Sequence, residues 1–228
     1  EFVRQGLAEG VIMSPRVYTP TQLEEHAAKI RKLGGHVLFD PQFYQPHTER
    51  EKLLTFPYWD QLDFSTRTFG LAEATGFCQR ALAYQVEELN VSHCIIPGRY
   101  TNSVSEDWLV TQHAFAEAAR DLRLEIPIYS TIALGPDVVA DQAAMYNVLD
   151  EISGYPVDGV YFVFTPPRAR FFARDESVLY NLLDSFLSIR LQHKDIIFGY
   201  ANQQALAYAI AGVNCIASGN FRNTRYFN

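Results

Sequence analysis

The stretch GVYFVFTPP, residues 159–167, decides the fold that the sequence predicts. It is an unbroken run of β-branched and aromatic residues that stops at two prolines. A run of this kind without polar alternation is typical of a strand buried on both faces, as in a parallel sheet. Similar apolar runs recur along the chain: VIMSPR (11–16), HVLFDPQ (36–42), HCIIPGR (93–99), IPIYSTI (126–132), IIFGYANQ (196–203) and NCIASGN (214–220), with a weaker one, QLDFSTR (61–67), in the widest gap.

Stretches with helical spacing separate most of these runs. The clearest begins at Thr19-Pro20-Thr21-Gln22, which reads as a capping box with proline in the first turn, and ends at Gly34-Gly35. The alternation predicts an α/β fold, a (β/α)8 TIM barrel, which typically takes about 250 residues. We expect one TIM-barrel domain over residues 1–228, as a fragment, domain or processed piece of a longer chain. Its strands are expected near 11–15, 36–40, 61–66, 93–97, 126–131, 159–164, 196–199 and 214–218.

Composition narrows the class of protein. The chain has 228 residues, 48% of them hydrophobic, which is enough for one large core, and its net charge of −7 argues against broad nonspecific affinity for nucleic acid. Its three cysteines form no CxxC motif, which favours a reducing compartment, so we expect a cytoplasmic protein. No apolar run is long enough to span a membrane. The sequence does not indicate the oligomeric state.

A barrel places its chemistry at the C-terminal ends of the strands. Asp40 follows the apolar run 36–39 directly, and apolar neighbours that desolvate a carboxyl can raise its pKa and suit it to acid–base or nucleophilic work. Asp40 is therefore the main catalytic candidate. Asp63 follows the same logic in a weaker strand. The alternative for Asp40 is a structural cap ahead of Pro41.

Other polar and aromatic side chains also follow the runs, and they are expected to bind substrate. An aromatic mouth suits stacking on a planar base or ring, although core packing explains some of the aromatic residues equally well. The substrate-binding candidates are Gln42, Phe43, Arg99, Tyr129, Tyr200, Asn202 and Asn220.

The last two units carry a phosphate-binding layout. Gly199 and Gly219 end strands, where glycine lets backbone N–H groups approach an anion, and Arg222 and Arg225 follow with positive charge. The alternative is that the glycines only relieve crowding. No HxH or HExxH pattern occurs, so no metal site is expected, and no cofactor is predicted.

Two stretches resemble the tRNA-guanine transglycosylases and their relatives that insert deazaguanines. HVLFDPQFYQ (36–45) is similar to their Asp-Ser-Gly-Gly-Phe-Gln strand end, and FGYANQQALAYAIAGVNCIASGNFRNTR (198–225) to their two final units. The resemblance implies the same barrel and base exchange at a glycosidic bond of a nucleic acid or nucleoside. It implies a nucleophilic or acid–base role for Asp40. Gln42 or Gln45 would be the counterpart of the glutamine in the family's strand end. The family's aspartate in the final strand aligns with Ala217.

Two further functions stay open at this point. One is a phosphate- or flavin-binding barrel enzyme with the ligand phosphate at Gly199 and Gly219. The other is a non-catalytic barrel module that binds nucleic acid or protein within a larger assembly. Fold alone does not choose between them.

Overall fold

The structure, a computed structural model, describes residues 1–16, 18–44, 53–59, 71–166, 173 and 175–219. Parallel strands alternate with helices through this part of the chain. The strands are β1 (Gly10–Met13), β2 (His36–Phe39), β3 (Cys94–Ile95), β4 (Tyr100–Thr101), β5 (Ile128–Leu134), β6 (Gly159–Phe164), β7 (Asp195–Gly199) and β8 (Cys215–Ile216). The helices are α1 (Pro20–Lys32), α2 (Leu71–Ala83), α3 (Glu106–Asp121), α4 (Pro136–Ala140), α5 (Gln142–Ser153) and α6 (Glu176–Leu191), with the 3₁₀ helices η1 (Leu53–Thr55) and η4 (Gln203–Ala211) and the π-helix η3 (Tyr84–Glu88).

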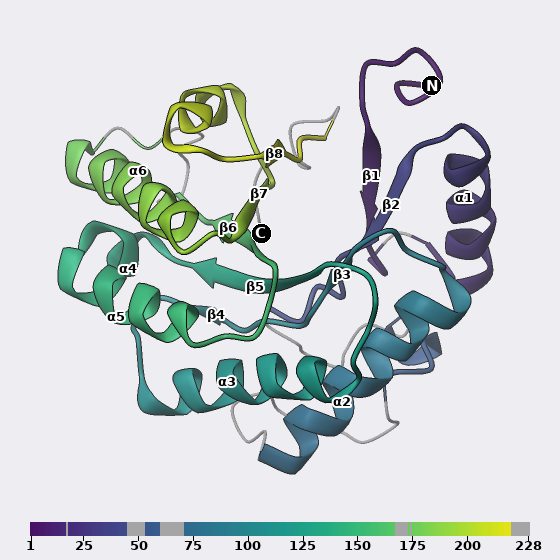
Figure 1. The fold of residues 1–228 in the computed structure, drawn as a ribbon, viewed down its shortest axis with the longest axis horizontal. Coiled ribbons are helices and arrows are strands. Elements are labelled where there is room, and N and C mark those ends of the chain that lie inside the picture. The colour runs from purple at the N-terminus through teal and green to yellow at the C-terminus, as the bar shows by residue number, and fades with distance from the viewer. Residues whose placement is uncertain (17, 45–52, 60–70, 167–172, 174, 220–228) are drawn as a thin grey trace.

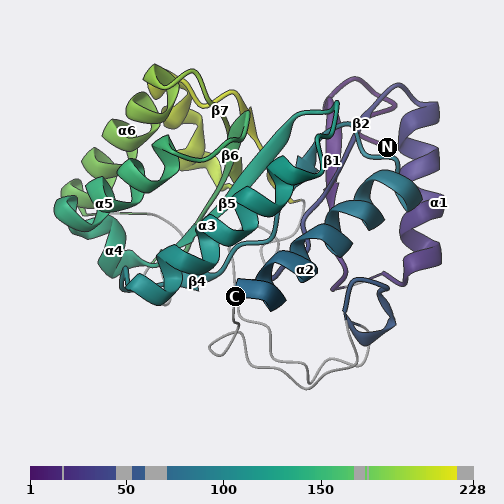
Figure 2. The ribbon, with the colours of Figure 1, turned by 60° about the horizontal axis from the view of Figure 1, so that its bottom comes forward.

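All the strand pairs are parallel, and they fall into two sheets. β1 pairs with β2, and a six-stranded sheet has the order β3-β5-β6-β7-β8, with β4 pairing with β5 further along that strand. The helices lie on the outer side of the curved strands (Figure 1), and α2 and α3 pack side by side (Figure 2). The arrangement is an open, barrel-like pair of parallel sheets.

The two sheets meet between β2 and β3 and then diverge. The Ser92 N–H donates to the Val37 carbonyl of β2 over 2.9 Å. Three residues after Ser92, in β3, both the N–H and the carbonyl of Ile95 bind the side chain of Gln85, at 3.0 and 2.8 Å. A side-chain amide therefore takes the backbone bonds that a neighbouring strand would otherwise make.

The apolar side chains form one core outside the strands and another within their curve. The inner cluster joins residues from both sheets: Leu38, Tyr44, Ile95, Tyr129, Ala133, Tyr161, Val163 and Ile197, with Ile12, Tyr100, Tyr200 and Ala217 against it. The outer cluster packs the helices onto the strands and includes Phe39, Phe77, Phe115, Phe162 and Phe186. Alternate residues of each strand face opposite clusters, as the pleat requires.

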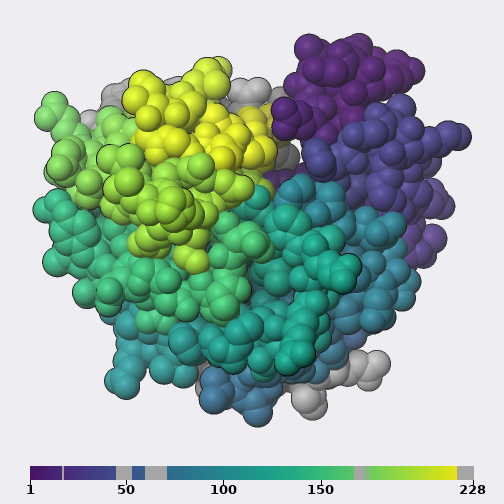
Figure 3. Space-filling view, in the orientation of Figure 1, coloured from purple at the N-terminus to yellow at the C-terminus, as the bar shows by residue number. Residues whose placement is uncertain are grey.

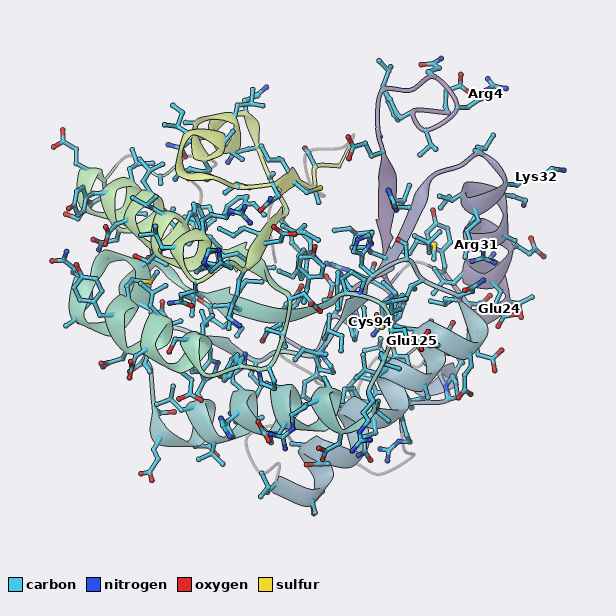
Figure 4. The ribbon with its side chains drawn as sticks, viewed as in Figure 1. Arg4, Glu24, Arg31, Lys32, Cys94 and Glu125 are labelled. Carbon is cyan, nitrogen blue, oxygen red and sulfur yellow. The ribbon has the colours of Figure 1, made fainter. Side chains whose placement is uncertain are left out.

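Side-chain contacts also fix α1 against the rest of the molecule. Arg31 donates to the backbone carbonyls of Leu89 and Asn90, just beyond η3, whereas its neighbour Lys32 extends away from the molecule (Figure 4). The capping box at Thr19 and Gln22 is present, as predicted.

In the space-filling view, the surface is hollowed between the yellow C-terminal segment and the purple N-terminal segment (Figure 3).

The sequence prediction is confirmed for the α/β class, for the parallel sheet and, within about two residues, for most strands. The strand predicted at 126–131 begins and ends later, at 128–134. The closed eight-stranded barrel is not shown, because the described strands form two separate sheets. The predicted strand at 61–66 lies outside the described residues. No helix in the described part of the chain is both long and apolar enough to cross a membrane.

Candidate active site

Asp40 follows the last residue of β2 and is buried, with 2% of its surface exposed. Its backbone N–H donates to the Met13 carbonyl at the end of β1, over 2.8 Å, and this bond fixes the chain at that point. The carboxyl group therefore sits at the C-terminal end of the strands, where barrel folds carry their chemistry.

Three tyrosine hydroxyls donate to one oxygen of this carboxyl group. Tyr44 reaches Asp40 Oδ2 over 2.6 Å, Tyr200 over 3.2 Å and Tyr161 over 3.3 Å. The other oxygen, Oδ1, accepts the backbone N–H of Gln42 over 2.8 Å. Because Tyr161 lies on β6 and Tyr200 follows β7, the contacts join the two sheets through Asp40.

Burial raises the pKa of Asp40 to about 6, although its hydrogen bonds from Tyr44, the Gln42 backbone, Tyr200 and Tyr161 lower it. The effect of desolvation on the pKa is larger than that of the hydrogen bonds, because the buried carboxylate loses its water and gains only one N–H and three phenol donors. Burial and the neighbouring Asp40 also raise the pKa of Tyr44, Tyr161 and Tyr200 well above the usual value. The tyrosines therefore stay neutral donors while Asp40 can take or release a proton near neutral pH.

A glycine makes room for one of the three tyrosines. A Cβ added at Gly199 would lie 2.6 Å from the ring of Tyr161, closer than packed atoms allow. Since Tyr161 stands on the neighbouring strand β6, the missing side chain at Gly199 lets its ring lie across β7 toward Asp40. This placement matches the alternative interpretation, in which Gly199 relieves crowding. An anion-binding role for Gly199 stays a prediction.

Two residues of the site have backbone angles that L-residues rarely adopt. Gln42 has φ +53° and Tyr200 has φ +51°, and the Gln42 side-chain amide donates to the Tyr200 hydroxyl oxygen over 2.6 Å. The other non-glycine residues with positive φ in the described part, Asn90, Arg123 and His193, each lie just past a helix end, where this conformation is common. Unusual backbone at Gln42 and Tyr200 is typical of a functional site.

A small cavity of about 20 Å³ adjoins the site, which is room for about one water molecule. Tyr200 forms part of its wall, between the ends of β6 and β7 and the start of η4. Its lining residues are Phe164, Pro166, Ala173, Phe198, Tyr200, Asn202, Gln204 and Tyr208.

The structure brings Asp40, Gln42 and Tyr200 together, as the sequence predicted, but it places other candidates elsewhere. Phe43 lies in the outer core, with its ring centroid 4.2 Å from that of Phe77. Arg99 is held against α3 by Asp107 and Thr111, at 2.8 and 3.0 Å.

Tyr129 is the second residue of β5, so it lies at the opposite end of the strands from Asp40, beside His93. The prediction misplaced it because the apolar run begins before the strand does. Asn202 caps η4 by accepting the Gln204 N–H over 2.8 Å, and it lines the small cavity beside Tyr200. Gly219 is the last described residue after β8, beyond Ala217 and Ser218.

Four further candidates, Asp63, Asn220, Arg222 and Arg225, lie outside the described residues. Their roles stay predictions, as do those of Gly219 and Arg99. Within the described ranges, no group of three or more His, Cys, Asp or Glu side chains is placed to hold a metal ion.

Sequence reasoning missed Tyr44 and Tyr161 as partners of Asp40. A signal for Tyr161 was present, because it shares the strand face of Gly159 and Val163 and so points inward in β6. Tyr44 carried no such signal, because it lies in a loop whose path the apolar pattern does not define.

Comparison with known proteins bears on the fold. No protein-family model matches the chain, and no curated protein matches it in sequence. A solved structure that resembles it is described as the HpcH/HpaI aldolase from Desulfitobacterium hafniense DCB-2, with a TM-score of 0.51, 15% sequence identity, and coverage of 96% of this chain and 80% of that one. At this identity the similarity concerns the fold alone.

This finding corrects the transglycosylase interpretation. The predicted resemblance to tRNA-guanine transglycosylases, and the base-exchange function with it, is wrong, because the solved structure that shares the fold is an aldolase. The quoted motifs reflect features that parallel α/β folds share: an acid after a strand, a glycine at a strand end, and a short turn before the next strand.

Proposed function

We propose that this protein is an enzyme of the lyase class that makes or breaks a carbon–carbon bond beside a carbonyl group, with Asp40 as the proton-transferring residue. The observation that carries the proposal is a buried carboxyl at the C-terminal end of β2, with a pKa of about 6, surrounded by neutral hydroxyl donors. A base with a pKa near the working pH is the most effective one for proton transfer.

The chemistry follows from the donors around Asp40. In the cleavage direction, the Asp40 carboxylate removes the proton of a β-hydroxyl group. The bond between the α and β carbons then breaks, its electron pair passes to the carbonyl as an enolate, and an aldehyde leaves. Protonated Asp40 returns the proton to the α carbon. Tyr44, Tyr161 and Tyr200 donate to Asp40 Oδ2 and so stabilise the carboxylate before the first proton transfer and after the second.

The similarity in fold to a solved aldolase supports this class over base exchange, although that similarity does not carry a substrate. The proposal therefore names a reaction type, and its test uses a panel of small ketones, aldehydes and oxo acids that differ in charge. Enolate formation is detected without a coupled assay, because hydrogens next to a carbonyl exchange for deuterium in D₂O and their proton NMR signal fades.

We expect exchange with at least one member of the panel, and a rate that rises with pH through about 6 as Asp40 ionises. Asp40→Asn should lower the rate by about 10²-fold or more, since it removes the base and keeps the size of the side chain. Asp150→Asn is the matched control, because Asp150 is an exposed carboxylate on α5, and it should leave the rate unchanged. Exchange that survives in Asp40→Asn, or no exchange with any compound, would contradict the proposal.

A further inference from the structure

We propose that Gln42 is a positioning residue that directs the hydrogen bonds of both Asp40 oxygens and leaves Oδ1 as the oxygen that exchanges the proton. The proposal rests on the proposed function only for the identity of that proton. The arrangement itself depends on contacts that can be tested without a substrate.

The two oxygens of Asp40 are unequally occupied. Oδ2 accepts from three hydroxyls, those of Tyr44, Tyr161 and Tyr200. Oδ1 accepts one donor among the described residues, the backbone N–H of Gln42. A carboxylate oxygen has about two lone-pair positions, so Oδ2 is saturated and Oδ1 keeps one position for a reacting group.

Gln42 acts on both oxygens at once. Its backbone N–H binds Oδ1 directly, and its side-chain amide donates to the Tyr200 hydroxyl oxygen over 2.6 Å. An amide N–H can only donate, so the Tyr200 oxygen is the acceptor in that bond. The Tyr200 hydroxyl in turn donates its proton to Asp40 Oδ2, 3.2 Å away.

The backbone of Gln42 fits this role. Its φ of +53° accompanies the turn that brings its N–H back onto the carboxyl group two residues earlier. Non-glycine residues rarely adopt this conformation, and they keep it only where surrounding contacts hold them there. Tyr200, at the other end of the amide bond, has the same conformation.

Three titratable groups donate to Asp40: Tyr44 from the segment after β2, Tyr161 from β6, and Tyr200 from the end of β7. Tyr58, from the segment after η1, also interacts with the Asp40 charge. All four have raised pKa values, so none gains charge while Asp40 titrates. A change in the pKa of Asp40 therefore reports a change in its hydrogen bonds.

The test is a double-mutant cycle read by ¹³C NMR of the Asp40 carboxyl carbon during a pH titration, with Asp40→Asn to assign the signal. Gln42→Leu and Tyr200→Phe should each raise the pKa of Asp40 by about one unit, because Tyr200→Phe removes a stabilising donor from the carboxylate and Gln42→Leu removes the amide that directs that donor. The double variant should show the same rise as either single variant, since Gln42 acts through Tyr200.

Tyr161→Phe is the matched control. Tyr161→Phe removes a bond of similar length on the same oxygen. The Gln42 amide donates to Tyr200 rather than to Tyr161, so the effect of Tyr161→Phe should add to that of Gln42→Leu. Additive shifts in the Gln42 and Tyr200 pair, or an unchanged pKa in Gln42→Leu, would overturn the proposal.

Gln42→Asn separates the amide contact from the backbone strain and serves if Gln42→Leu does not fold. Asparagine tolerates positive φ but is too short to reach Tyr200, so the same rise in pKa is expected. An unchanged pKa in that variant would assign the effect to the backbone and contradict the proposal. If the pKa shifts of the Gln42 and Tyr200 variants are non-additive as expected but the protein shows no exchange activity, the proposed function is contradicted and this inference is not.

Discussion

Gly199 makes a single-residue prediction about the packing that supports the site. Gly199→Ala would place a Cβ 2.6 Å from the Tyr161 ring, and the strand pairing between β6 and β7 prevents the backbones from separating. We expect a loss of about 1–3 kcal/mol in the free energy of unfolding, in the range of overpacked cores. Thermal melting measures it.

Gly154→Ala is the control for that substitution. A Cβ at Gly154 would contact only a carbonyl oxygen, at 3.6 Å, and its φ of −80° suits any residue. The free energy of unfolding of this variant should therefore lie within about 0.5 kcal/mol of that of the natural protein. If both variants melted alike, Tyr161 would have room to move, and its contact with Asp40 would not depend on Gly199.

Single residues also show how far the sequence predicts the site. Asp40 was predictable because an acid directly after an apolar run must lie at a strand end. Tyr129 was misplaced because its run starts two residues before β5, and that shift moves it to the opposite end of the strand. The tyrosine cluster was not predictable, because the hydroxyl of Tyr161 reaches Asp40 across 121 positions of sequence.

At the scale of elements, the π-helix η3 makes the junction between the two sheets. It places Gln85, fully buried, against the backbone of Ile95 in β3. Gln85→Leu keeps the bulk but leaves a buried N–H and carbonyl without partners. We expect a loss of about 3 kcal/mol in the free energy of unfolding, measured by urea denaturation.

Glu87→Leu introduces the same side chain at an exposed position of η3 and should change stability by less than about 0.5 kcal/mol. An equally mild effect of Gln85→Leu would mean that β2 and β3 are held together in another way. The sequence predicts only a stretch with helical spacing between the apolar runs 61–67 and 93–99. It does not predict η3, which places Gln85 against Ile95, because the local apolar pattern does not record that contact.

At the scale of the whole molecule, Asp40 directly follows a strand of the two-stranded sheet. Tyr161 lies in a strand of the six-stranded sheet, and Tyr200 directly follows another. The candidate site therefore joins the two sheets on the inner side of their curve. The sequence predicted the alternation of strands and helices, because that alternation follows from local patterns, the apolar runs and the helical spacing between them. It did not predict the division into two sheets, because this depends on a side chain bound between strands that are distant in the chain.

This location makes stability depend on the ionisation of Asp40. Its pKa rises from 3.8 in the unfolded chain to about 6 in the folded protein. Between these values the folded protein holds a proton that the unfolded chain has released, so stability falls as pH rises through this window. The loss is complete above pH 6 and amounts to about 3 kcal/mol, at about 1.36 kcal/mol per pKa unit.

Asp40→Asn removes this dependence and leaves the other titrating groups in place. Subtracting the two proteins' free energies of unfolding, measured by urea denaturation from pH 4 to pH 7, isolates the contribution of Asp40. The difference should move by about 2.4 kcal/mol in favour of asparagine over this range as the pH rises, mostly between pH 4 and pH 6. A difference that stayed flat, or that moved in favour of aspartate, would show that the folded protein does not raise the pKa of Asp40. The reason for assigning proton transfer to it would then be lost.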